Sequence, residues 1–357
     1  MIDGDSRLTD EGLSPHDRAL MRQETKEVEL DEVGVGATTS GDFEILQGYD
    51  AELEREYGII VPPELVQRQE ELEQYAREHN RDARVIYEAF FQLFHLRRKF
   101  GHKVDTPDLD QEDLGVGLAA ALLHDIGKSG SPEATPARRK LISRLYNLVR
   151  PDINRETPIN DAVNILCNEA TARGKKGDLL SKLNSYLLEL SKIGINPNDL
   201  MKSLYSRHAE WGEQLLKKYL DQSNPVNQRI TRVASAHHYF EGYKKEEVDL
   251  SLPPTSEEEA HDRFLIKMLI VLDKYQASRV RRGWPAAESL AYVREVIRNN
   301  GMARDPIFEA LVGHICDTKE EDLEWLRKDL GLSVIAQLEK TTPVFELGRT
   351  VPAEVKK

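Results

Sequence analysis

Apolar residues recur along most of the chain with the spacing of an α-helix. Ile86, Phe90 and Leu93 follow one another at offsets of four and seven, which places them on one helical face. The stretch Leu114–Leu123 is small and apolar throughout, which is typical of a helix buried on all sides. The same reasoning predicts further helices over the ranges 136–148, 160–172, 179–193, 198–220, 225–238, 257–279, 285–300 and 305–315.

The signals at the helix ends support this interpretation. Thr106-Pro107 and Thr135-Pro136 each combine an N-cap residue with a proline at the first helical position. The turn-prone segment 173–177 separates two of the predicted helices. No run of alternating β-branched residues indicates a strand. We therefore expect an all-α fold.

Acidic residues are concentrated at the beginning of the chain. Residues 1–60 hold 16 of the 62 acidic residues but only 5 of the 49 basic ones, in a chain whose net charge is −13. Because the first forty residues have few aromatics and little periodicity, we expect 1–60 to be an acidic, largely disordered leader. Residues 61–320 should form the folded domain, with 133–198 as a helical insertion, and 321–357 should form a C-terminal helix and tail.

The composition argues against several classes of function. The acidic balance disfavours general nucleic-acid binding, whose affinity rests on Lys and Arg. The longest largely apolar stretch, Phe264–Leu272, is too short to cross a membrane, and no secretory signal opens the chain. With only Cys167 and Cys316, neither a disulfide framework nor a cysteine-based zinc site is available. We expect a cytoplasmic protein without a membrane partner.

A His-Asp pair follows the buried helix, in the segment Leu123-His124-Asp125-Ile126-Gly127-Lys128. Adjacent helical residues point about 100° apart, but at a helix end, before Gly127, both side chains can converge on a pair of metal ions. The two oxygens of Asp125 could then bridge the ions. A second pair, His261-Asp262, lies in a polar helix start, and we interpret it as a surface feature.

Three other segments offer nitrogen or oxygen ligands. His208 is followed four residues later by Gly212, a small residue that lets a neighbouring helix approach. His237 and His238 are adjacent, and Asp273 lies inside an apolar helix, where an unpaired carboxylate would be costly to bury. Imidazole and carboxylate ligands without thiolate suit iron, manganese or zinc rather than a structural zinc finger.

In this order the segments resemble the HD superfamily of metal-dependent phosphohydrolases. The double histidine and the D-x-Y-x-A segment that begins at Asp273 are similar to the HD-GYP branch, whose members are typically cyclic-di-GMP phosphodiesterases. The resemblance covers roughly residues 85–135 and 200–315 and implies an HD-domain helical bundle. Two departures stand out: the GYP signature is reduced to Glu241-Gly242-Tyr243-Lys244, and Gln276 stands where the family commonly has an acid.

The resemblance also implies a set of site residues. Two divalent ions, of iron, manganese or a similar metal, would be held without an organic cofactor by His124, Asp125, His208, His237, His238 and Asp273. Asp125 would bridge the ions and act in catalysis. Lys128 would contact a phosphate oxygen or steer the nucleophile. Arg279, Arg281 and Arg282 would recognise a phosphate or a guanine edge.

The family places one more ligand on the helix before the His-Asp pair. His95 lies 29 residues before His124 and is our preferred candidate. Glu88 shares a helical face with His95 and is a second candidate. His79 is a third, if the intervening helix is longer.

These inferences lead to the expectation of a metal-dependent hydrolase of a phosphodiester or nucleotide, with cyclic-di-GMP as the suggested substrate. One alternative is an HD hydrolase of another nucleotide or of a phosphomonoester. The other is a degenerate HD module that binds and signals without catalysis. The expected partner is a small phosphate-containing ligand such as a cyclic dinucleotide, and a protein partner could bind the leader or the insertion.

Overall fold

The computed structural model describes residues 40–75, 107–146, 153–172, 179–243, 248–278 and 284–317, together with residue 148 and individual positions between 86 and 94. Within these ranges the fold is all-α, as predicted, and contains no strand. None of the helices in this part of the chain is long and apolar enough to cross a membrane. The helices are α2 (Ser40–Tyr57), α3 (Pro63–Tyr75), α5 (Gln111–Leu123), η2 (Ile126–Ser129), α6 (Pro136–Tyr146), α7 (Ile159–Ala172), α8 (Leu179–Lys192), α9 (Met201–Tyr219), α10 (Pro225–Ser235), η3 (Ala236–Glu241), α11 (Glu257–Gln276), α12 (Ala286–Asn299) and α13 (Pro306–Asp317).

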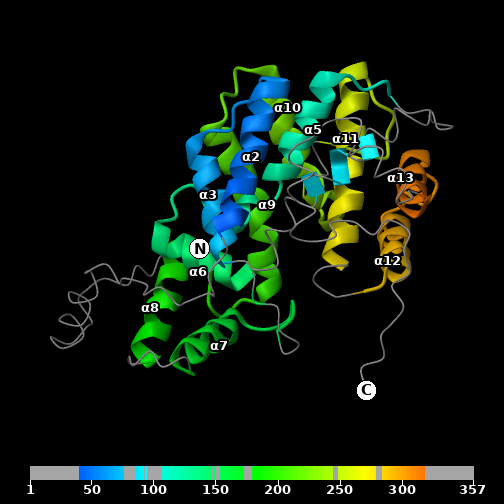
Figure 1. The fold of residues 1–357 in the computed structure, drawn as a ribbon. Coiled ribbons are helices and arrows are strands. Elements are labelled where there is room, and N and C mark those ends of the chain that lie inside the picture. The colour runs from blue at the N-terminus through cyan, green and yellow to red at the C-terminus, as the bar shows by residue number, and fades with distance from the viewer. Residues whose placement is uncertain are drawn as a thin grey trace, which may run out of the picture.

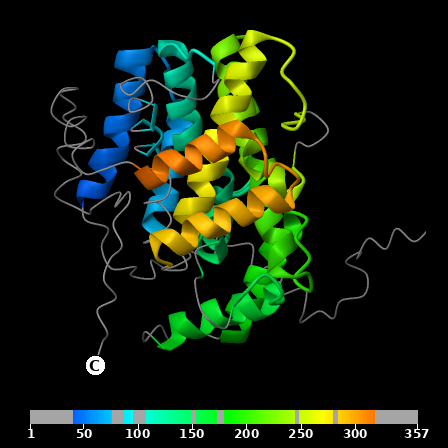
Figure 2. The same cartoon turned by 90° about the vertical axis from the view of Figure 1, so that its right-hand side faces the viewer.

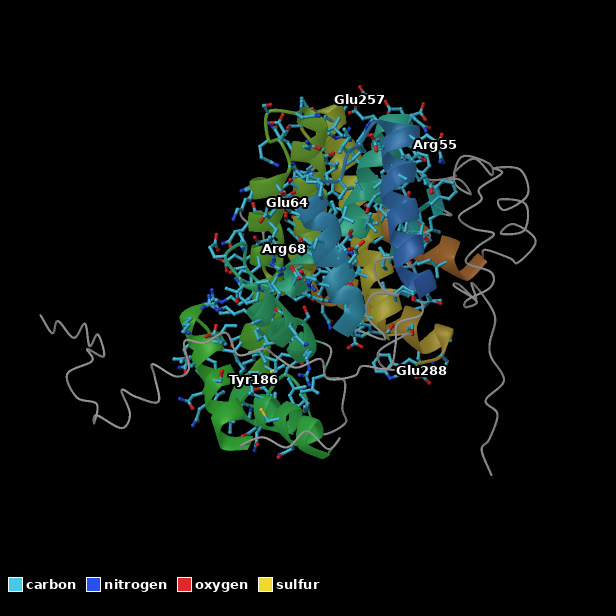
Figure 3. The ribbon with its side chains drawn as sticks, turned by 60° about the vertical axis from the view of Figure 1, so that its left-hand side comes forward. Arg55, Glu64, Arg68, Tyr186, Glu257 and Glu288 are labelled. Atoms are coloured by element: carbon cyan, nitrogen blue, oxygen red, sulfur yellow. The ribbon has the colours of Figure 1, made fainter. Side chains whose placement is uncertain are left out.

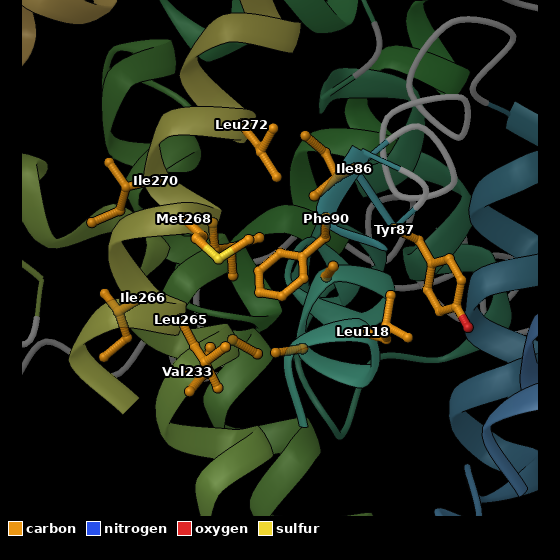
Figure 4. Close-up of a cluster of buried hydrophobic side chains, with 14 of the residues drawn as sticks. Ile86, Tyr87, Phe90, Leu118, Val233, Leu265, Ile266, Met268, Ile270 and Leu272 are labelled. Carbon is orange, nitrogen blue, oxygen red and sulfur yellow. The ribbon is translucent and has the colours of Figure 1, made fainter. Parts of the chain in front are cut away.

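The main hydrophobic core surrounds α5, which packs against α2, α10 and α11 (Figure 1). Small residues in α5 let its neighbours come close. A Cβ atom on Gly117 would lie 2.2 Å from Cε1 of Phe90, so this ring packs directly on the backbone of α5. Phe90 and Leu118 belong to the same buried cluster as Leu265 and Met268 of α11 (Figure 4). Helices α12 and α13 pack against α11 (Figure 2).

Helices α6, α7 and α8 form a separate group at one end of the bundle (Figures 1 and 2). They lie within the range 133–198 that was expected to be a helical insertion. Their core contains Leu145, Val163 and Leu190, and it continues into α9 through Leu204 and Trp211. The first half of α9 therefore packs with the insertion, while its second half packs with the main bundle.

The predicted start of the helix before His124 is wrong. Helix α5 begins at Gln111 rather than after Thr106-Pro107, because the Asp110 side chain accepts a hydrogen bond from the Asp113 backbone N–H, and the Asp113 side chain accepts one from the Asp110 backbone N–H. This reciprocal pair satisfies two backbone donors at the helix start. Residues 40–57, within the range 1–60 that was expected to be a largely disordered leader, form α2, whereas residues 1–39 and 318–357 lie outside the described part of the chain.

A buried ion-pair network joins α5, α10 and α11 at the end of the bundle remote from His124. Arg229 of α10 donates to Asp113 of α5 and, over 2.8 Å, to Asp262 of α11. His261 Nδ1 lies 2.9 Å from Asp113. The interpretation of His261-Asp262 as a surface feature is therefore wrong, since Asp262 is only 1% exposed and its charge is paired.

Candidate metal centre

The His124-Asp125 pair lies where α5 ends and the single turn η2 begins. His124 is the C-cap of α5 and still has helical backbone angles, whereas Asp125 has left the helix with φ −98° and ψ 8°. This change of direction between adjacent residues lets both side chains turn toward one centre, as the sequence predicted for a helix end. Helix α3 supports the turn from outside, because Arg68 (labelled in Figure 3) donates to Ser129 Oγ and to the carbonyl oxygens of residues 130–132.

Helix α9 crosses η2 at close range and brings His208 to the site. A Cβ atom on Gly127 would lie 1.9 Å from the carbonyl oxygen of His208 and 2.5 Å from the amide nitrogen of Gly212. A Cβ atom on Gly212 would lie 3.6 Å from its nearest neighbour, which is an ordinary contact. The close approach was predicted from Gly212, but the residue that strictly requires glycine is Gly127.

The double histidine lies in η3, just after α10, and Asp273 lies in the last turns of α11. The backbone kinks at His238, with φ −95° and ψ 20°, so the two neighbouring rings are not held at ordinary helical directions. Their ring centroids lie 4.1 Å apart. Gly242 ends η3 with φ 95°, a left-handed conformation that glycine adopts without strain.

The six side chains form two groups that share Asp125. In one group, Oδ1 of Asp125 lies 3.3 Å from His208 Nε2 and 3.6 Å from His237 Nε2. His238 completes this group, with its Nε2 atom 2.6 Å from that of His208. In the other group, Oδ2 of Asp125 lies 3.3 Å from His124 Nε2, which is 4.0 Å from Asp273 Oδ1. In each group the ligand atoms lie within 4.8 Å of one another.

Backbone carbonyls orient three of the four histidines. His124, His208 and His237 each place Nδ1 at 2.6–2.7 Å from the carbonyl oxygen three residues earlier. A carbonyl only accepts, so Nδ1 must carry the proton in each ring and Nε2 presents its lone pair to the centre. The Nε2 atoms of His124 and His237 are fully buried and have no hydrogen-bond partner among the described residues. Buried polar atoms without partners are costly, and a metal ion would satisfy both.

The electrostatic environment keeps the carboxylates charged and two imidazoles neutral. Burial alone would raise the pKa of Asp125, but Lys128 and His124 outweigh it and hold that pKa well below its ordinary value. Burial also lowers the pKa of His208 to about 4 and that of His238 well below its ordinary value. Ionised carboxylates and neutral imidazoles are the forms that coordinate metal ions.

Three further residues contact the site and were not singled out from the sequence. Lys274 Nζ lies 3.2 Å from Asp273 Oδ2 and 2.6 Å from Glu241 Oε1. The ring of Tyr146 from the insertion meets that of His208 edge-on, with centroids 5.5 Å apart. Lys274 could have been found from the sequence, because it is a charged residue next to Asp273 at the end of an apolar run. Nothing in the sequence indicated Tyr146, because it lies 62 positions from His208.

The structure brings together His124, Asp125, Lys128, His208, His237, His238 and Asp273. Lys128 donates to Asp125 Oδ2 and is 5% exposed. The side chains of the three candidates for a further ligand, His95, Glu88 and His79, lie outside the described residues, as do Arg279, Arg281 and Arg282.

These buried histidines and carboxylates lie within the distances of a metal-binding site and are compatible with a divalent ion. In comparisons with protein-family models, curated proteins and solved structures, none matched the chain.

Proposed function

We propose that this protein is a metal-dependent phosphohydrolase that cleaves a phosphodiester or nucleotide, with cyclic-di-GMP as the first substrate to test. The observation that carries the proposal is the position of Asp125. Its two oxygens face two different groups of ligands, one with three histidines and one with His124 and Asp273. A carboxylate shared in this way is the arrangement that a pair of ions requires.

The donor set supports two divalent ions of iron, manganese or a similar metal. Both groups consist of imidazole and carboxylate without thiolate, and the two unpartnered Nε2 atoms fall one in each group. Such ions, held by these residues, would polarise a phosphodiester and make a water molecule more acidic near neutral pH.

The chain's own residues would then hold and orient the reactants. Asp125 fixes the spacing of the two ligand groups, because both depend on the one carboxylate. Lys128 lies against Asp125 and is the described cation best placed to meet a phosphate oxygen at this centre. A cation at this position would offset the negative charge that develops on the phosphate during attack.

A combined metal and activity assay tests the proposal. Metal content would be measured in the purified protein, and hydrolysis of bis-(p-nitrophenyl) phosphate and cyclic-di-GMP would be followed for wild type and for the His124→Ala/Asp125→Ala variant. We expect wild type to bind metal and the variant to lose at least about 100-fold in turnover, since both ligand groups lose a member.

His261→Gln provides a matched control, because His261 also faces a buried carboxylate but lies at the opposite end of α5 from His124. It should keep both metal and turnover. Wild-type protein without metal, or undiminished turnover in the double variant, would rule out the catalytic proposal.

A further inference from the structure

His238 differs from the other three histidines in what holds its ring. The others donate Nδ1–H to a backbone carbonyl of the preceding turn. His238 follows the kink in η3, and its Nδ1 atom faces a side chain instead, with Glu241 Oε2 at 3.4 Å. For His238 to ligate an ion through Nε2, its proton must reside on Nδ1. Glu241 is the carboxylate that the structure places beside this Nδ1 atom, at ion-pair distance.

Glu241 is itself held by a buried lysine. Lys274 Nζ lies 2.6 Å from Glu241 Oε1 and 3.2 Å from Asp273 Oδ2. The Lys274 side chain is 8% exposed, so its charge is largely removed from water and is matched by these two carboxylates. The contacts form a chain from His238 through Glu241 and Lys274 to Asp273, and thus from one ligand group to the other.

We infer that Glu241 is a positioning residue for His238, and that the Glu241–Lys274 ion pair couples the two halves of the metal centre. The inference rests on the proposed two-ion site. Glu241 fixes the ring of His238 with Nε2 toward the ion shared with His208 and His237. The ion pair with Lys274 holds Glu241 away from the centre, so that its carboxylate orients His238 without itself ligating an ion. The same lysine restrains the Oδ2 atom of Asp273 and leaves Oδ1 toward His124.

The test is a titration of metal-free protein with Mn²⁺ against a chromophoric chelator, without substrate. Glu241→Ala should weaken the affinity for one of the two ions by about 10- to 100-fold, the usual effect of removing a group that orients a ligand. Glu241→Gln keeps a carbonyl oxygen that can accept from Nδ1 and should fall between Glu241→Ala and wild type. Lys274→Met frees Glu241 and should weaken the binding of both ions.

Glu213→Ala is the matched control. This α9 carboxylate accepts a hydrogen bond from Tyr243, two residues after Glu241, and is ion-paired with Lys217. It should titrate like wild type. Thermal unfolding of the metal-free variants separates a loss of ligand orientation from a loss of folding. If Glu241→Ala does not fold, Glu241→Gln carries the test.

Wild-type titration curves for both Glu241 variants would overturn this role of Glu241 and leave the proposed hydrolase untouched. Conversely, a wild-type protein that binds two ions but hydrolyses neither diester would refute the hydrolase, and the titration would still decide the role of Glu241.

Discussion

Three histidines of the candidate metal centre donate Nδ1–H to the carbonyl oxygen three residues earlier, and the fourth faces Glu241. Each ring therefore has a defined direction before any ion is present. Two of the carbonyl partners, Ala121 and Ala234, lie in the last turns of α5 and α10, where backbone acceptors are not fully used, whereas Tyr205 lies within α9. In the rings of His124, His208 and His237 the same contacts leave Nε2 as the atom that would coordinate an ion.

Asp50 is a half-buried residue whose carboxylate oxygens are buried, and it lies far in the sequence from the candidate metal centre. Burial, with the charge of Glu70 nearby, raises the pKa of Asp50 from its ordinary 3.8 to about 7. Neither of its oxygens has a hydrogen-bond partner among the described residues. Between pH 4 and 7 the unfolded chain therefore binds fewer protons at this position than the folded one, and stability falls as the pH rises.

Asp50→Asn should remove this loss, because the amide carries no charge. The full pKa shift of Asp50 corresponds to roughly 4 kcal/mol of stability. Because partial solvent access reduces this effect, we expect Asp50→Asn to raise the free energy of unfolding by about 1–2 kcal/mol at pH 8. The gain should vanish by pH 4. Urea unfolding at the two pH values measures it, and an equal effect at both would contradict the assigned pKa.

At the scale of elements, the contact between η2 and α9 determines whether His208 reaches Asp125. Gly127→Ala should separate the two elements, because its Cβ atom would lie 1.9 Å from a backbone oxygen that cannot move independently of α9. We expect a loss of more than about 3 kcal/mol in stability, together with weakened metal binding.

Gly212→Ala is the natural comparison. Its Cβ atom would have ordinary contacts, and alanine favours the helical backbone by up to about 1 kcal/mol over glycine. It should be neutral or stabilising and should keep the metal. Urea unfolding with metal analysis distinguishes the two variants, and equal damage from both would show that the close approach has been assigned to the wrong glycine.

The sequence was sufficient to predict most helices because their apolar faces repeat over many residues. It was less informative for α2, where Tyr49 and Leu53 are buried against the core within a segment dominated by acidic residues. The start of α5 was also misplaced, because the motif Thr106-Pro107 lies four residues before the side-chain pair that actually caps the helix. Local motifs identify candidate caps, and packing decides which one is used.

The meeting of these histidines and carboxylates at one centre could be predicted from the sequence, because they are rare residue types in apolar surroundings. The residues that orient the ligands could not, because their role depends on contacts across the fold. Glu241 and Lys274 are 33 positions apart and meet only when η3 packs on α11. The requirement for glycine at position 127 likewise appears only once α9 crosses η2.

At the scale of the whole molecule, the insertion and the main bundle share α9, which carries His208. Tyr146 from the insertion contacts the ring of His208 and donates to the carbonyl oxygen of Leu204. Residues of the range 133–198 therefore pack around His208, which belongs to the group with His237 and His238. Residues 1–60 hold 16 acidic and 5 basic residues and leave the remaining chain close to neutral, so the net charge of the chain does not argue against the proposed phosphate substrate.

The central claim is that Asp125 lies between two metal ions. Anomalous X-ray scattering from crystals of the manganese-loaded protein tests it most directly. We predict two anomalous peaks per chain, one beside each oxygen of Asp125, with one peak among His208, His237 and His238 and the other between His124 and Asp273. A single peak, peaks elsewhere on the protein, or none at full manganese loading would contradict the account.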